Sequence, residues 1–117
     1  MATATRYSNL ASAPSVDVFS ALANPARRKI LMHLRKGPCA VNDLAKGFAI
    51  GRPAVSEHLQ VLRKAHLVRE EPRGRERYYY LDPRPLSEVE QWIGAFSAYW
   101  KARLAALEDV LKREAGS

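Results

Sequence analysis

The sequence predicts a mainly α-helical domain over residues 15–117 that carries one small β-hairpin. Apolar residues recur every three or four positions along most of the chain, which indicates helices, whereas strand-like alternation is confined to residues 67–81. A length of 117 residues leaves room for one domain with a modest core. Residues 1–14 are small and polar with little periodicity, so we expect them to form a flexible arm.

The charge balance favours a polyanionic partner. Lys and Arg number 19 against 12 Asp and Glu, and 15 of the basic but only 7 of the acidic residues precede residue 85. The single cysteine excludes an intrachain disulfide framework and fits a reducing compartment. There is no secretory signal and no apolar run long enough to span a bilayer, so we expect a cytoplasmic protein without a membrane partner.

Two helices are expected before residue 37. Ser12 or Ser15 could cap the first, and Asn24-Pro25 ends it and begins the second. One side of the first helix carries Val16, Phe19 and Leu22, and the core face of the second carries Ile30, Leu31 and Leu34. The basic side chains of the second helix should stay solvated, although Arg27 and Arg28, near its start, could instead reach a phosphate.

Residues 41–48 predict a short helix, residues 49–51 a tight connection, and residues 52–65 a second helix. Gly51 can serve as N-cap, and Pro53 fits the first helical turn, where the missing N–H has no intrahelical partner. Val55, Leu59 and Leu62 form an apolar stripe that must face a core, while the polar face consists of Arg52, Ser56, Gln60 and Arg63. Such a short, hydrogen-bonding face suits base edges in a major groove, but an ordinary solvated surface helix has the same pattern.

Two strand-like runs, 67–71 and 77–81, flank the segment Pro72–Glu76 and predict a β-hairpin. Arg73, Arg75 and Arg77 alternate, so in an extended strand they would lie on one side and could contact phosphates or a minor groove. The neighbouring acidic residues Glu70, Glu71 and Glu76 could instead pair with these arginines. Tyr78 and Tyr80 should share one side of the strand and Tyr79 the other, as packing residues.

A long helix is expected over about residues 86–114, opened by a capping box at Ser87–Glu90. Its apolar stripe is too long for residues 1–84 to cover, so we expect the first and last helices to pack against their counterparts in a second chain. An intrachain helical hairpin could cover part of the stripe instead. The expected dimerisation residues are Val16, Phe19, Trp92, Phe96, Tyr99, Trp100, Leu104, Leu107 and Leu111.

Three segments, ALANPARRKILMHL (21–34), RPAVSEHLQVLRKAHLV (52–68) and ERYYYLDP (76–83), resemble the ArsR family of winged helix-turn-helix repressors. The resemblance covers nearly everything after about residue 16 and is greatest to the branch without metal-binding boxes. It implies a winged helix-turn-helix fold with long N- and C-terminal dimerisation helices. One departure is Gly51, where the family usually has a serine N-cap; glycine there costs only a few tenths of a kcal/mol.

The resemblance implies a homodimeric, sequence-specific regulator that binds an inverted repeat in double-stranded DNA. It would repress its own or neighbouring genes in a bacterial cytoplasm, associated with the nucleoid. The expected DNA-binding residues are Arg52, Pro53, Ala54, Ser56, Glu57, His58, Gln60 and Arg63 of the recognition helix and Arg73, Arg75 and Arg77 of the wing. The alternatives are a protein-interaction module that binds DNA incidentally, and the same repressor with a redox or ligand input, for which the sequence shows no effector site.

We expect no metal, no cofactor and no enzymatic activity. In metal-sensing members of the family two cysteines precede an Asp-Leu pair; aligning on Asp43-Leu44 puts Ala40 and Asn42 there, and Cys39 alone cannot bind a soft metal. Cys39 is expected to be a small core or boundary residue, with redox sensing as the alternative. Ser56, Glu57 and His58 are consecutive helix positions that point about 100° apart, so they cannot converge on one reacting atom.

Overall fold

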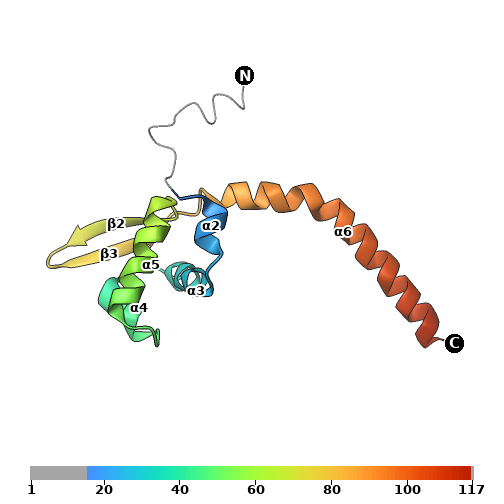
Figure 1. Cartoon of the computed structure of the whole chain (residues 1–117), viewed down its shortest axis with the longest axis horizontal. Helices are drawn as coiled ribbons and strands as arrows, with labels where there is room; N and C mark the ends of the chain where they lie inside the picture. The colour runs from blue at the N-terminus through green and yellow to red at the C-terminus, as the bar shows by residue number, and fades with distance from the viewer. Residues whose placement is uncertain (1–15, 117) are drawn as a thin grey trace, which may run out of the picture. The chain divides into compact units, whose positions relative to one another are not determined.

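The computed structural model describes residues 16–116, and the predicted arm and the predicted caps Ser12 and Ser15 lie outside this range (Figure 1). The chain divides into two compact units, one ending at Leu86 and one beginning at Ser87. Within the described range, no helix combines the length and apolar character needed to cross a bilayer.

Two helices open the first unit. α2 (Val18–Leu22) begins later than a cap at Ser12 or Ser15 predicts, because the Asp17 carboxylate accepts a hydrogen bond from the Phe19 N–H at 2.6 Å and takes the N-cap position. α3 (Pro25–Leu34) begins where predicted. The Asn24 side chain caps it by accepting from two backbone N–H groups, and Pro25 occupies the first helical position.

The helix-turn-helix consists of α4 (Val41–Lys46) and α5 (Arg52–Lys64), which pack against each other (Figure 1). The predicted core faces of α3 and α5 are confirmed, since Ile30, Leu31, Leu34, Val55, Leu59 and Leu62 are buried. Of the residues expected on one side of the first helix, Phe19 and Leu22 lie in α2 and are half-buried, whereas Val16 precedes the helix; the buried residues of α2 are Val18 and Ala21.

A three-stranded antiparallel sheet forms the wing, in the order β1 (Cys39–Ala40), β3 (Glu76–Leu81), β2 (Val68–Arg73). The predicted hairpin is confirmed, but its turn is shorter than predicted and consists only of Gly74 and Arg75. Gly74 has φ of +62°, as the first position of a two-residue hairpin turn requires. The strand β1 was not predicted, because two residues carry no periodicity.

α5 is joined to β2 by a tight C-terminal motif. The N–H of Leu67 donates to the Leu62 carbonyl at 3.0 Å and the N–H of His66 to the Arg63 carbonyl at 2.9 Å. These are the two hydrogen bonds of a Schellman motif, and they place His66 in the left-handed region with φ of +61°. This motif sets the direction in which the wing leaves the recognition helix.

The second unit is dominated by the helix α6 (Leu86–Ala115). The predicted capping box at Ser87–Glu90 is wrong, because the helix already begins at Leu86 and Ser87 lies inside it. Pro85 fixes a helical φ one residue earlier and lets the chain enter the helix before the predicted cap. None of the side chains of α6 is buried.

Candidate nucleic-acid interface

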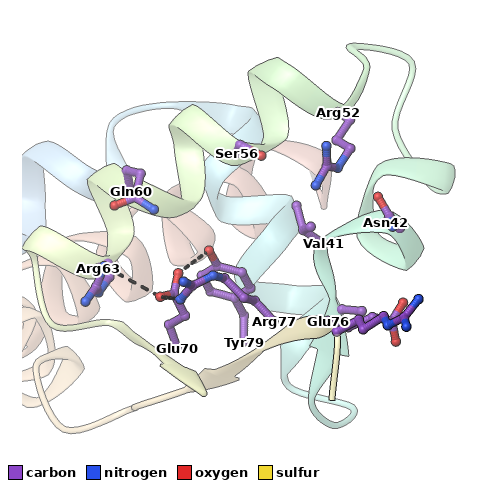
Figure 2. A pocket seen from close by; sticks show the side chains of 12 residues that line it. Val41, Asn42, Arg52, Ser56, Gln60, Arg63, Glu70, Glu76, Arg77 and Tyr79 are labelled. Atoms are coloured by element: carbon purple, nitrogen blue, oxygen red, sulfur yellow. Dashed lines mark hydrogen bonds and ion pairs between the residues drawn. The ribbon is translucent and has the colours of Figure 1, made fainter. Parts of the chain in front are cut away.

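The polar face of α5 is exposed to solvent along one side of the molecule. Arg52, Ser56, Gln60 and Arg63 line a hollow of about 660 Å³ between α5 and the hairpin (Figure 2). Ser56 is half-buried and the other three are exposed. Within residues 16–116, the side chains of Arg52, Ser56 and Gln60 make no hydrogen bond or ion pair, so their donors and acceptors are available to a ligand.

The expected DNA contacts Pro53, Glu57 and His58 lie on the side of α5 nearer α3. They line a second hollow of about 510 Å³ together with Arg27. Ala54 is half-buried beside them on the same helix. The first turns of α5 therefore present polar groups toward both hollows.

Arg27 is not the solvated side chain that the sequence predicts. Its guanidinium donates from Nε to the Ala21 carbonyl at 2.7 Å and from Nη2 to the Ser20 carbonyl at 3.2 Å, and so binds the C-terminal end of α2. Its Nη1 lies 3.4 Å from Nδ1 of His58 on α5. Arg28 donates to the Leu22 carbonyl at 2.7 Å. Both arginines therefore donate to carbonyl groups at the C-terminal end of α2, and Arg28 remains exposed.

The prediction that Arg73, Arg75 and Arg77 share one side is wrong. The turn at Gly74-Arg75 reverses the chain, so Arg73 pairs with Glu76 across the hairpin and Arg77 pairs with Pro72. Directly paired residues share a face and successive residues alternate, which puts Arg73 and Arg77 on opposite faces.

On the outer face of the hairpin, Arg73 lies against Tyr78 and Tyr80. These two tyrosines share one side of β3, as predicted. The Arg73 guanidinium lies 4.8 Å from the Tyr78 ring centroid and 5.4 Å from that of Tyr80, and it donates to the Tyr80 hydroxyl. Arg75, in the turn, is exposed and makes no ion pair within the described residues. Arg75 is therefore the arginine of the hairpin that is most available to a phosphate.

The inner face carries a cluster around Glu70, in which the contacts of Glu70 with Tyr79 and Arg63 were not predicted from the sequence. One carboxylate oxygen accepts from Arg77 at 2.5 Å and lies 3.8 Å from the Arg63 guanidinium, and the other accepts from the Tyr79 hydroxyl at 2.6 Å (Figure 2). The open alternative, local ion pairing of the wing arginines, is thus confirmed for Arg77. Only knowledge of the strand register could have shown that Glu70 faces Tyr79.

Both acid–base groups at the centre of this cluster are perturbed. The hydrogen bond from Tyr79, followed by the charges of Arg77 and Arg63, lowers the pKa of Glu70 against the opposing effect of burial. Burial, and then the contact with the Glu70 carboxylate, raises the pKa of Tyr79 to about 12. At neutral pH the cluster therefore holds one carboxylate, one neutral phenol and two guanidinium groups.

A buried carboxylate, that of Asp82, stabilises the segment that follows the hairpin. Asp82 accepts from the Arg84 backbone N–H at 3.1 Å and from the Arg84 guanidinium at 2.6 Å and 2.9 Å. The hydrogen bonds from the Arg84 side chain lower the pKa of Asp82. This link lies within the short segment that follows β3.

Cys39 is a boundary residue, as the sequence predicts. It is half-buried in β1, opposite Tyr79 in β3. Burial, with a smaller effect of the Asp43 carboxylate, raises the pKa of its thiol, which disfavours the reactive thiolate. Among the described residues, no three His, Cys, Asp or Glu side chains are grouped so that they could hold a metal ion.

The apolar face of α6 is exposed in the single chain. Trp92 and Phe96 stack edge to face with centroids 5.1 Å apart, and the Arg103 guanidinium lies 4.2 Å from the Tyr99 ring centroid. Val110 extends this face beyond the dimerisation residues that the sequence identified. The large exposed side chains are Trp92, Ile93, Phe96, Tyr99, Trp100, Leu104, Leu107, Val110 and Leu111.

Comparison with known proteins places this geometry in a family. Residues 24–70 match the profile described as "Bacterial regulatory protein, arsR family". An HTH-type transcriptional regulator of Mycobacterium tuberculosis, Rv2034, is 42% identical over 69% of this chain and 80% of its own length. The transcriptional repressor SdpR of Bacillus subtilis is 35% identical over 66% of this chain and 86% of its own.

Solved structures agree with the fold. An ArsR-like transcriptional regulator from a Rhodococcus species superposes with a TM-score of 0.62 at 29% identity, covering 91% of this chain and 95% of its own. The homodimeric winged helix-turn-helix DNA-binding domain from Mycobacterium bovis superposes with a TM-score of 0.59 at 25% identity, covering 82% and 84%. The predicted winged helix-turn-helix architecture is confirmed, and its long C-terminal helix is present.

Proposed function

Because this chain belongs to the ArsR family of bacterial transcriptional regulators, we propose that it is a homodimeric repressor that binds an inverted repeat through α5 and the hairpin tip. The family consists of transcriptional regulators and not of enzymes, and it carries a winged helix-turn-helix DNA-binding domain. We add to this family assignment that the protein acts as a homodimer, that its site in DNA is an inverted repeat, and which residues contact that site.

One observation carries the proposal: Arg52, Ser56 and Gln60 point from one face of a rigid helix into an open hollow without intramolecular partners in the described range. The opposite face of the helix is anchored by Val55, Leu59 and Leu62, so the polar face cannot turn inward. Glutamine and arginine are the side chains that bind base edges in pairs of hydrogen bonds, and serine allows close approach.

Dimerisation supplies the second copy of this face. The M. bovis neighbour is a homodimer, and here α6 exposes nine large apolar side chains that water solvates poorly. A two-fold dimer would place two copies of α5 in successive major grooves, about one DNA turn apart, and an inverted repeat is the sequence that this symmetry matches.

The roles of the hairpin arginines follow from their surroundings. Arg75 would contact a phosphate because it is exposed at the turn, and Arg73 would approach the backbone with its orientation fixed by two tyrosines. Arg77 would contribute positive potential while it stays paired with Glu70. Phosphate contacts of this kind hold the protein on DNA without distinguishing sequences.

The test compares a preferred duplex, selected by the protein from random sequences, with a scrambled duplex of the same composition. Gln60→Ala should weaken the preferred duplex by about tenfold or more and the scrambled one little, because it removes a base contact. Gln91→Ala, an exposed glutamine on α6, is the matched control and should change neither. Arg75→Ala should weaken both duplexes alike.

Equal loss on both duplexes with Gln60→Ala would contradict base recognition by α5. Absence of any preferred duplex, together with no retardation of the promoter fragment upstream of its own gene, would favour the alternative of a protein-interaction module.

A further inference from the structure

The Glu70 cluster joins the two elements that are proposed to contact DNA. Arg63 lies in the last turn of α5, and Arg77 lies in β3 of the hairpin. A single oxygen, Oε1 of Glu70, lies 2.5 Å from the Arg77 guanidinium and 3.8 Å from that of Arg63. The two arginines thus share one carboxylate oxygen across the hollow that separates helix and wing.

The carboxylate itself is fixed from the core side. Its other oxygen accepts from the hydroxyl of Tyr79, which pairs with Glu70 directly across the two strands. Tyr79 is only 5% exposed and also pairs with Cys39 in β1, so its ring cannot move without disturbing the sheet. The Glu70 side chain is 10% exposed, whereas Arg63 and Arg77 are 53% and 63% exposed.

These exposures distinguish the nearly buried Glu70 carboxylate from the exposed guanidinium groups of Arg63 and Arg77. A carboxylate that is nearly buried and held by a buried phenol has few alternative positions, while the two exposed guanidinium groups keep donors that face solvent. A negative charge so close to the proposed DNA-binding surface opposes binding to phosphates.

We infer that Glu70 is a positioning residue for DNA recognition: it orients Arg63 toward the bases and fixes the hairpin relative to α5 without touching DNA itself. The inference rests on the proposed function. Its consequence is that Glu70 weakens general affinity for DNA yet increases discrimination between sequences. A residue that only stabilised the fold would affect all sequences equally.

The test uses Glu70→Gln, with Glu71→Gln as the matched control. Both variants remove one negative charge from neighbouring positions of β2, but Glu71 is exposed on the opposite face and has no ion-pair partner in the described part of the chain. Fluorescence anisotropy is measured on the selected duplex and on the scrambled duplex at several salt concentrations, at temperatures below the unfolding midpoint of each variant.

Both variants should bind the scrambled duplex more tightly than the wild type. Only Glu70→Gln should lower the ratio of affinities for the selected and scrambled duplexes, by about tenfold, the typical effect of one misplaced base contact. In the double variant Glu70→Gln/Arg63→Ala, the loss of discrimination should be smaller than the sum of the losses in the two single variants, because both changes act on the same contact.

An unchanged ratio in folded Glu70→Gln, or the same change of ratio in Glu71→Gln, would overturn the inference. If Glu70→Gln does not fold, Tyr79→Phe replaces it. That variant removes only the hydroxyl that anchors the carboxylate; it should lower the ratio in the same direction, and an unchanged ratio would again overturn the inference. A wild-type protein that prefers no sequence would instead contradict the proposed function.

Discussion

Replacing Leu104 by alanine should weaken self-association of the chain by about 30-fold. Leu104 lies in the middle of the apolar face of α6 and is 56% exposed in the single chain. Truncating a leucine to alanine costs roughly 2 kcal/mol of stabilising free energy when the side chain is fully buried. About half of the Leu104 side chain is exposed in the single chain and would become buried only in the dimer, so each subunit loses about half of that energy. Each substitution occurs twice in a two-fold dimer, so the loss is about 2 kcal/mol.

The assay is analytical ultracentrifugation of the wild type, Leu104→Ala and Gln91→Ala over a range of micromolar concentrations. Gln91 is exposed and lies on roughly the opposite side of the helix at about 100° per residue, so its substitution should leave the dissociation constant unchanged. A wild type that sediments as a single subunit throughout, or a Leu104→Ala variant that dimerises as tightly as the wild type, would refute the assignment of this face to dimerisation.

Two further predictions concern stability. His66→Gly should raise the free energy of unfolding by about 0.5–1 kcal/mol, because His66 has a φ of +61° that glycine adopts without strain; His66→Ala keeps the Cβ atom and should bring no such gain in chemical denaturation. Asp82 has a lowered pKa in the folded chain, so the unfolded chain binds its proton more readily. The free energy of unfolding of the wild type should therefore fall as the pH drops through the ordinary pKa range of Asp toward the lowered pKa of the folded chain. Asp82→Asn should be less stable than the wild type at neutral pH, but it should lose less stability on acidification. Denaturation curves between about pH 3 and 7 measure both effects.

The sequence allowed the helices with one buried face to be predicted well. In α3 and α5 the apolar residues recur at helical spacing, and the same residues form the core. The same pattern predicted the polar face of α5, because helix residues that do not belong to the buried apolar stripe must face outward. Its open position beside the hairpin agrees with that expectation.

Features that depend on tertiary pairing could not be predicted in this way. The arginines of the hairpin alternate in sequence, but a two-residue turn between them reverses the chain, and so Arg73 and Arg77 lie on opposite faces. The contacts of Arg27 with the carbonyls of α2 and the contact of Glu70 with Tyr79 join residues that no local pattern relates. The predicted capping box does not open the helix, because α6 already begins at Leu86.

The most direct test of the central claim is interference by guanine N7 methylation on the duplex that the protein selects from random sequences. Methylation at N7 blocks the major groove, where α5 is proposed to bind. The account predicts two clusters of interfering guanines, related by the symmetry of an inverted repeat and centred roughly 10 base pairs apart, with weaker interference in Gln60→Ala. A single unrepeated cluster, or binding that is insensitive to methylation of every guanine in the duplex, would contradict it.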